Sequence, residues 1–413
     1  MDTARTLVTS YCFPPYSDTA GIVAAKRVLE AGRPVDVICN AMDAIRRRDH
    51  SLTAIGGDLV RRFHPVPSPS AFSSWPSIDA FADLGYRVAL TWEREQAPYD
   101  KLYSRAQFAA SHFLAARYKL AHPGVQWTAE FSDPLSHDVL GKVRTSPWQE
   151  GFLSHLLRTG IEQAGFCAPT DPNALLWCET STFALADRFL FTNERQRDFM
   201  LERCPDPALA DRVGQRAVVS PHPTLPRRFY SMVSSGYELP ADRVNIGYFG
   251  NFYANRGTGL LLDALATAPS AVTDRVLVHI FTSKPAGLIE AVRAKGVSTS
   301  VRVNPYVDYL EFLNLTDRMD LLLVNDAVTP PAGTVNPFLP SKWSDYKGST
   351  TPVWAVIEED SPLDSQPGIA YRTPVEHLSG LQAVLADVAE HGVTSEAPAN
   401  AALSSAMEVT TAA

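Results

Sequence analysis

A basic residue follows an apolar, strand-like run that ends at a glycine past the middle of the chain. The run VNIGYFG covers residues 244–250, and Asn251 and then Arg256 come after it. Loops at the carboxyl ends of parallel strands carry side chains that meet ligands. The planar guanidinium of Arg256 suits a diphosphate, which it can hold through two parallel hydrogen bonds. The stretch predicts a diphosphate site, although one isolated arginine is also typical of an ordinary surface.

A second polar cluster, PSKWSDY, covers residues 340–346. Lys342 and Asp345 lie three positions apart, so on a helix they share one face. An ammonium group suits phosphate, and a carboxylate suits paired sugar hydroxyls. The alternative is a plain ion pair on an exposed helix, worth only about 0.2–0.5 kcal/mol. We interpret the two clusters as two parts of one nucleotide-sugar site.

The glycine patterns argue against two other nucleotide-binding classes. Neither Gly21 nor Gly250 lies in a GxGxxG fingerprint, and the chain has no GxxxxGK[ST] motif. A dehydrogenase and a P-loop nucleotidase are therefore disfavoured. Gly21 instead opens a predicted helix after the first strand, where backbone N–H groups could meet a phosphate or simply form a tight turn.

Strands and helices alternate around these residues, as in a parallel α/β sheet. The predicted strands of the first half are 6–12, 34–41, 87–92, 125–134, 187–191 and 217–223. The predicted helices there are 21–32, 106–122 and the segment after Thr192 or Asn193. A second α/β series starts with VNIGYFG and continues through RVLVHIFTS, VRVNPYV, LLLVNDA and PVWAVIEE.

The 413 residues exceed what one hydrophobic core usually supports, so the chain should form two domains. We predict an α/β protein with a first Rossmann-like domain over 1–232 and a linker over 233–243. A second Rossmann-like domain follows over 244–373, then a helix over 374–392. The tail 393–413 is rich in small and polar residues and is predicted to be disordered.

Composition and charge limit the classes of partner. The net charge is −8, which argues against a nucleic-acid binder. Five scattered cysteines without zinc spacing fit free thiols in a reducing compartment, and neither a signal peptide nor a spanning segment is evident. We therefore expect a cytoplasmic protein. The arginines at 46–48 and 61–62 form either a solvated helix face or a surface for anionic lipid headgroups at the inner membrane face.

The order of these motifs resembles the retaining GT-B glycosyltransferases, most closely glycosyltransferase family 4. The segments that carry the resemblance are FPPYSDTAG (13–21), WTAEFSDP (127–134), GYFGNFYANRG (247–257) and PSKWSDYKGSTTPV (340–353). It implies a GT-B fold, with two Rossmann-like domains facing across a cleft. It also implies transfer of a sugar, of hexosyltransferase type, from a nucleotide-diphosphate sugar to a hydroxyl of a glycan or lipid-linked acceptor. Retention at the transferred carbon and no metal or other cofactor are expected, in cell-surface polysaccharide or glycoconjugate synthesis.

The resemblance also implies roles on the donor side. Arg256 and Lys342 would bind the diphosphate as catalytic cations, Gly21 would meet it through its backbone, and Asp345 would bind the donor ribose. The other donor-side candidates are Gly250, Asn251, Phe281, Thr282, Tyr306, Val307 and Asn336.

Two positions depart from the family pattern. Asn251 falls where the family has an arginine, and Pro337 falls where it has a glutamate that contacts the donor sugar. Asn336 is expected to contribute instead. The departures keep open a non-catalytic partner or chaperone of another glycosyltransferase. A nucleotide-sugar epimerase also stays open, although it would need acidic groups and a histidine around the sugar.

Acceptor-side residues are expected at strand ends of the first domain and on a neighbouring helix. They are Asp18, Arg105 and Glu130, with His112 and Asp133 as catalytic candidates. Each catalytic candidate has a plain alternative. His112 lies in the apolar segment AASHFLAA and would equally suit a core position, and Asp133 before a proline would equally suit a turn.

Overall fold

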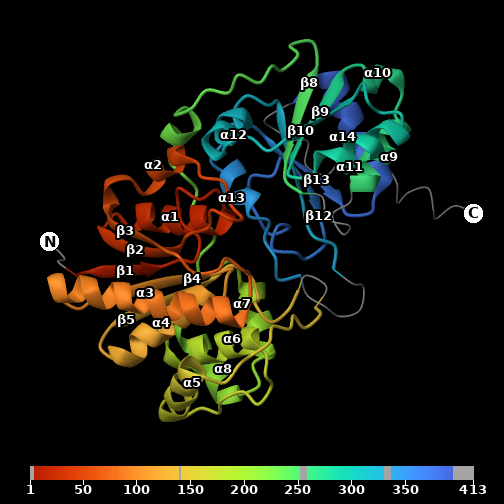
Figure 1. Ribbon diagram of the computed structural model, residues 1–413. Coiled ribbons are helices and arrows are strands. Elements are labelled where there is room, and N and C mark those ends of the chain that lie inside the picture. Colours follow the sequence, from red (N-terminus) through yellow and green to blue (C-terminus); the bar gives the residue numbers. More distant parts are fainter. Residues whose placement is uncertain (1–3, 139–140, 252–257, 330–335, 394–413) are drawn as a thin grey trace, which may run out of the picture. The chain divides into compact units, whose positions relative to one another are not determined.

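The computed structural model describes residues 4–138, 141–251, 258–329 and 336–393 (Figure 1). The two compact units of the chain are Met1–Pro223 with Pro330–Phe338, and Thr224–Thr329 with Leu339–Ala413. The chain thus leaves the first unit for the second at residues 223 and 224, whereas the sequence placed this change at residue 232. The cleft expected between the domains stays a prediction, and all but the first residue of the expected disordered tail lies outside the described residues.

Seven parallel strands form the sheet of the first unit (Figure 1). The strands are β1 (Thr6–Thr9), β2 (Val35–Asn40), β3 (Val60–Val66), β4 (Lys101–Ala106), β5 (Gln126–Phe131), β6 (Arg188–Phe191) and β7 (Ala217–Val219). Their order is β3-β2-β1-β4-β5-β6-β7. The winding direction therefore reverses between β1 and β4. Ligands of doubly wound sheets bind outside the carboxyl ends of the strands at such a reversal.

Helices connect these strands. They are α1 (Thr19–Ala31), α2 (Thr53–Gly56), α3 (Trp75–Glu95), α4 (Ala110–Ala121), α5 (Phe152–Gln163), α6 (Ala174–Leu185), α7 (Glu194–Glu202) and α8 (Pro207–Arg216). The predicted end of the first helix is confirmed, because Gly32 follows α1 with φ 62° and donates its N–H to the carbonyls of Val28 and Leu29. Asn193 is confirmed as the N-cap of α7, where its side chain accepts from the Gln196 N–H at 2.8 Å.

One predicted strand of the first domain is wrong, and two strands were missed. Residues 87–92 belong to α3, whose buried residues recur every three to four positions from Trp75 to Ala89. The unpredicted strands are β3 and β4. Pro65 lies within β3, which is tolerated because β3 is an edge strand. Arg61 and Arg62 therefore lie on a strand and not on a helix face.

Six parallel strands form the sheet of the second unit. They are β8 (Val244–Phe249), β9 (Val276–Thr282), β10 (Val301–Pro305), β11 (Leu321–Asn325), β12 (Val353–Ile357) and β13 (Tyr371–Pro374). The five strands predicted from VNIGYFG to PVWAVIEE are confirmed as β8 to β12. The order β10-β9-β8-β11-β12-β13 is that of a dinucleotide-binding Rossmann sheet, with its reversal between β8 and β11.

The helices of the second unit are α9 (Thr258–Ala266), α10 (Ser270–Thr273), α11 (Pro285–Ala294), α12 (Tyr309–Thr316), α13 (Lys342–Tyr346) and α14 (Leu378–His391). Apolar residues of α9, α11 and α14 pack with the strands in one continuous core. Burial of this apolar area is the main stabilising contribution to the unit. Among the described residues, none of the helices is both long and apolar enough to span a lipid bilayer.

Candidate active site

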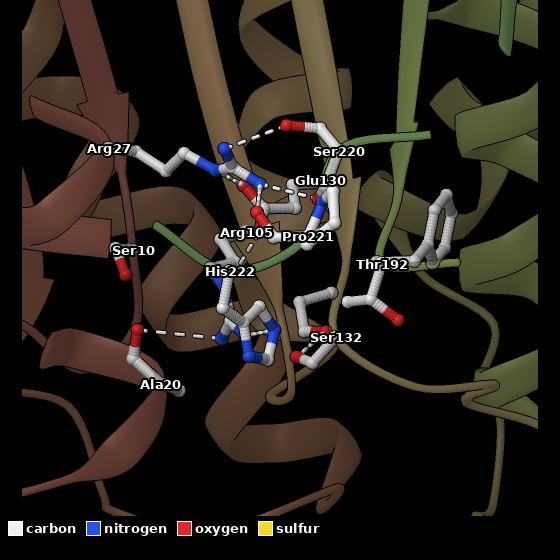
Figure 2. Close-up of polar contacts among 12 residues, drawn as sticks. Ser10, Ala20, Arg27, Arg105, Glu130, Ser132, Thr192, Ser220, Pro221 and His222 are labelled. Carbon is white, nitrogen blue, oxygen red and sulfur yellow. Dashed lines mark hydrogen bonds and ion pairs between the residues drawn. The ribbon is translucent and has the colours of Figure 1, made fainter. Parts of the chain in front are cut away.

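A buried cluster of charged side chains lies at the strand ends of the first unit (Figure 2). Arg27 comes from α1, Arg105 from β4 and Glu130 from β5, and His222 follows β7. Arg27, Arg105 and Glu130 are 8%, 3% and 0% exposed, respectively. We name these four residues the strand-end cluster. Arg105 lies at the end of β4, one of the two strands at the reversal of the sheet, where ligands of this architecture bind.

Arg27 uses its whole guanidinium in contacts within the protein. Its Nε donates to Glu130 Oε2 at 2.9 Å, and Nη1 donates to Glu30 at 2.9 Å and to the Ser220 hydroxyl at 2.8 Å. Its Nη2 donates to the carbonyls of Ser220 and Pro221 at 2.7 and 3.0 Å. All five N–H groups are thus satisfied. Arg27 fixes the loop after β7 against α1 and β5.

Arg105 is held more weakly. Its Nε reaches Glu130 Oε1 at 3.4 Å, and its Nη1 reaches the Ala20 carbonyl at 3.4 Å. The shortest contact, at 3.1 Å, joins Nη2 to Nε2 of His222. Figure 2 shows the Arg105 guanidinium reaching both Ala20 and His222. Two contacts lie beyond ordinary N–H···O distances, so this buried cation is far less well compensated than Arg27.

The contact with Arg105 determines the tautomer of His222. A guanidinium only donates, so His222 Nε2 accepts and the ring proton lies on Nδ1. Burial lowers the pKa of His222 well below its ordinary value, and the charges of Arg105, Lys26 and Arg27 lower it further. The partly buried His222 is therefore a neutral ring with an Nδ1–H donor.

Glu130 is the carboxylate that compensates both arginines. Its Oε2 accepts from Arg27 and, at 2.7 Å, from the Tyr103 hydroxyl. Burial and the charge of Glu130 raise the pKa of Tyr103 well above its ordinary value, so the phenol stays protonated and donates. Among the described residues, Oε1 accepts only from Arg105 Nε, at 3.4 Å. Two buried guanidinium groups thus share one buried carboxylate.

Two further predicted residues lie at the start of α1. Asp18 is the N-cap: its Oδ1 accepts from the Ala20 N–H and its Oδ2 from Arg46 Nε, both at 2.8 Å. Gly21 packs against the strand-end loop, and a Cβ there would lie 3.0 Å from backbone atoms of Cys12 and Phe13. Asp18 thus caps α1, and Gly21 allows α1 to approach the loop after β1 closely.

His112 lies in the core of the first unit. It is 0% exposed, its Nδ1 lies 2.7 Å from the Ser104 hydroxyl, and its ring packs edge-on to Trp127 and Phe131. Burial lowers its pKa to about 3. This is the core position that the apolar segment also suggested, and we withdraw His112 as a catalytic candidate. Asp133, partly buried in the bend after β5, stays a prediction.

In the second unit, Asn251 joins the ends of β8 and β9. Its Oδ1 accepts from the Thr282 hydroxyl at 2.9 Å, from the Ser283 N–H at 3.1 Å and from the Ser283 hydroxyl at 2.8 Å. The Gly250 N–H donates to the Phe281 carbonyl at 3.0 Å. The structure therefore brings four predicted donor-side residues together, and Asn251 acts there as a positioning residue.

The remaining strand-end candidates differ in exposure. Phe281 and Thr282 are 1% and 3% exposed, and Phe281 stacks on Phe249 with ring centroids 4.7 Å apart. Tyr306, 47% exposed, and the partly buried Val307 follow β10. Arg256 lies outside the described residues.

Lys342 and Asp345 lie on α13 and form the ion pair that their spacing allowed, with Nζ 3.8 Å from Oδ2. Asp345 is 5% exposed, and its Oδ1 accepts from the Tyr309 hydroxyl at 2.6 Å. The Lys342 ammonium lies 4.2 Å from the ring centroid of Phe312. The backbone carbonyl of Asp345 also accepts from the Tyr230 hydroxyl, at 2.5 Å. The carboxylate is thus fixed in position.

Asn336 and Pro337 belong by their contacts to the first unit. Asn336 is 5% exposed, and its Oδ1 accepts from the Phe338 N–H at 3.0 Å. The Pro337 carbonyl accepts from the Asn193 side chain at 3.0 Å. The segment that the resemblance assigns to the donor sugar is therefore held to the N-terminus of α7.

Metal ligands are not grouped in the part of the chain that the structure describes. It contains no set of three or more His, Cys, Asp and Glu side chains that could hold a metal ion.

Sequence reasoning named Arg105 and Glu130 as site residues, noted His222 with a purely structural role as the alternative, and missed Arg27. Arg27 lies inside a helix, where an arginine is usually a surface residue. The signal for His222 was its place in SPHP after the last strand of the first unit. Loops after strands of an α/β sheet carry function more often than helix faces do.

Neither a protein-family model nor a curated protein sequence matches the chain. Solved structures do match it in fold. Sucrose-phosphate synthase from Thermosynechococcus elongatus has a TM-score of 0.59 at 11% identity, covering 94% of this chain and 90% of that one. The glycosyltransferase WaaG, involved in lipopolysaccharide biosynthesis, has a TM-score of 0.55 at 14% identity, covering 93% and 90%. A UDP-N-acetylglucosamine 2-epimerase described as putative, from Listeria monocytogenes, has a TM-score of 0.53 at 12% identity, covering 96% and 92%. The fold of this chain is therefore GT-B, with two Rossmann-like domains.

Proposed function

We propose that the chain is a glycosyltransferase that moves a sugar from a nucleotide-diphosphate sugar to a hydroxyl of an acceptor. One observation carries the proposal: each unit has a doubly wound sheet with polar side chains gathered at strand ends beside its reversal. Sucrose-phosphate synthase and WaaG, which are similar in fold, support a transferase. The family 4 relationship and retention at the transferred carbon are parts of the same proposal.

The donor would bind to the second unit. Asp345 is held in place by Tyr309 and suits the paired hydroxyls of a ribose. Lys342 is adjacent to it, and Arg256 follows the β8 strand end. Departure of a nucleoside diphosphate develops negative charge, and preorganised cations at that point lower the barrier. Lys342 and Arg256 would supply this positive charge without a metal ion.

The acceptor would bind to the first unit, at the strand-end cluster. Glu130 is engaged by two guanidinium groups and a phenol, so its role is to position Arg105 and Arg27 and not to accept a proton. In a retaining front-face reaction the departing phosphate takes the acceptor proton, so no protein base is needed. Closure of the two domains would exclude water, whose attack would hydrolyse the donor.

Two rival functions make different predictions. An epimerase would interconvert nucleotide sugars and needs an acid–base pair at the sugar. Among the described residues, the strand-end cluster offers a single carboxylate that is already ion-paired. A non-catalytic partner of another transferase would bind protein and turn over no donor.

The cellular setting is part of the proposal. We place the protein in the cytoplasm, in assembly of a cell-surface glycan on a lipid-linked acceptor at the inner membrane face. In the arginine-rich segments 46–48 and 61–62, three of the positive charges are already paired with carboxylates and would be less available to such a membrane. Arg46 pairs with Asp18, Arg48 with Asp43 and Arg62 with Glu95.

A thermal-shift panel of UDP-, GDP-, ADP- and CMP-linked sugars tests donor binding. A ligand that binds only the native state stabilises it, by about 2.7 kcal/mol at a ligand concentration of a hundred times the Kd. This stabilisation raises the melting temperature. We expect one base to stand out and Asp345→Asn to reduce its effect. A matched Asp364→Asn variant, in an ion pair with Arg372 on the same unit, should leave the response intact. No response from a folded protein would argue for the non-catalytic partner.

A further inference from the structure

The strand-end cluster has an excess of buried positive charge. Arg27 and Arg105 are each more than nine-tenths buried, and Glu130 is the one carboxylate that both contact. The second acidic partner of Arg27 is Glu30, whose side chain is 56% exposed and therefore well screened by water. Within the described part of the chain, the two buried guanidinium charges thus have one buried negative charge between them.

The Arg105 guanidinium has more N–H donors than it uses in hydrogen bonds with the described residues. It makes three hydrogen bonds where Arg27 makes five, and two of the three are 3.4 Å long. Leaving buried charged donors poorly paired is costly, and a bound anion is one arrangement that removes this cost. The fork of a guanidinium matches the two oxygens of a phosphate or carboxylate.

His222 supplies a second hydrogen-bond donor, and its ring is partly exposed to solvent. Its Nε2 accepts from Arg105, so Nδ1–H points its proton away from that contact. His222 is partly exposed whereas Arg105 is buried, so a ligand reaching Arg105 would approach along the ring. A neutral imidazole and a guanidinium offer donors only to such a ligand, which suits an anion and not a cation.

We propose that Arg105 and His222 bind an oxyanion, a phosphate or a carboxylate, that belongs to the acceptor. This rests on the proposed function, because it identifies the class of acceptor used at that site: a sugar or lipid-linked glycan with an acidic group near the hydroxyl that is glycosylated. Arg105 and His222 would then determine specificity by rejecting neutral acceptors, whose binding would leave the buried guanidinium poorly paired.

Calorimetric titration of the full chain with inorganic phosphate, and separately with acetate, at constant ionic strength tests the site. We expect one of these anions to bind and Arg105→Gln to weaken it at least about tenfold, the range for a lost charge-assisted hydrogen bond. His222→Phe, which keeps a ring but lacks the donor, should weaken it several-fold. Arg117→Gln is the matched control, since it removes another buried arginine of this unit, paired there with Asp83. It should bind the anion as the parent does.

Titration of UDP, GDP and ADP into the same proteins separates the two sources of the anion. Unchanged nucleotide affinity in Arg105→Gln assigns the site to the acceptor, and a loss as large as that for phosphate would assign it to the donor and overturn the proposal. Absence of anion binding to the parent chain, or equal binding by Arg105→Gln, would overturn it as well. If Arg105→Gln does not fold, His222→Phe decides. Failure of all nucleotides to bind the parent would count against the proposed function, whatever phosphate does.

Discussion

Replacing Glu130 with glutamine tests whether one buried carboxylate holds the strand-end cluster together. Glutamine keeps the shape of the Glu130 side chain. Its amide oxygen can still accept from Tyr103 and Arg27, whose donor atoms lie 2.7 and 2.9 Å from Glu130 Oε2 in the structure. What it removes is the negative charge between two buried guanidinium groups. Removing one partner of a buried ion pair costs about 3–5 kcal/mol, because the remaining charge stays desolvated. For a unit of this size that corresponds to a fall in Tm of about 6–20 °C.

Differential scanning calorimetry measures this effect, and the two units can unfold in separate transitions. Glu30→Gln is the matched control, because Glu30 pairs with the same arginine at the same 2.9 Å but is 56% exposed. An exposed pair of this kind contributes about 0–1 kcal/mol. If Glu130→Gln lowers Tm no more than Glu30→Gln does, the cluster is not a tightly coupled charge network.

The remaining predictions concern the donor side, metal dependence and pH. Arg256→Ala should lower turnover by about 10²–10³, typical of a lost transition-state contact, in steady-state kinetics; near-normal turnover would remove Arg256 from the diphosphate. Treatment with EDTA should leave turnover unchanged, and its loss on chelation with recovery on adding Mg²⁺ or Mn²⁺ would contradict the metal-free mechanism. Burial and then the charge of Arg302 lower the pKa of His279 to about 4 from 6.5, so the unfolded chain binds its proton first as pH falls. The stability of the second unit should therefore be complete above pH 6.5 and fall by up to about 3 kcal/mol toward pH 4, and denaturant titrations of His279→Gln should show a flatter profile.

The sequence predicted the second unit better than the first. Its strands β8, β9, β11 and β12 are mostly apolar runs bounded by turn residues, which is the pattern of strands buried on both faces. The short edge strand β13 (Tyr371–Pro374), in which buried and exposed residues alternate, was missed. In the first unit, β4 (Lys101–Ala106) mixes polar and apolar residues, and β3 contains a proline that normally argues against a strand. Position in the sheet explains β3, since an edge strand tolerates proline. The 87–92 segment misled because its apolar residues fit a strand locally, whereas the whole of α3 has helical spacing.

The candidate site was predictable only where residue type and strand end coincide. Arg105 and Glu130 satisfied both conditions, and so did Asn251 and Thr282. Arg27 lies on a helix, 103 positions before Glu130 in the sequence, and no local sequence pattern encodes the contact between them. His112 shows the opposite case, because a polar residue in an apolar helical segment bonds to Ser104 within the core.

Proton NMR of the full chain incubated with the nucleotide sugar that stabilises it, with and without acidic acceptor sugars, tests the central claim most directly. We expect release of nucleoside diphosphate that depends on the acceptor, together with a new glycoside whose anomeric configuration matches that of the donor. Conversion of the donor to an isomer still attached to its nucleotide would identify an epimerase and exclude glycosyl transfer as the activity.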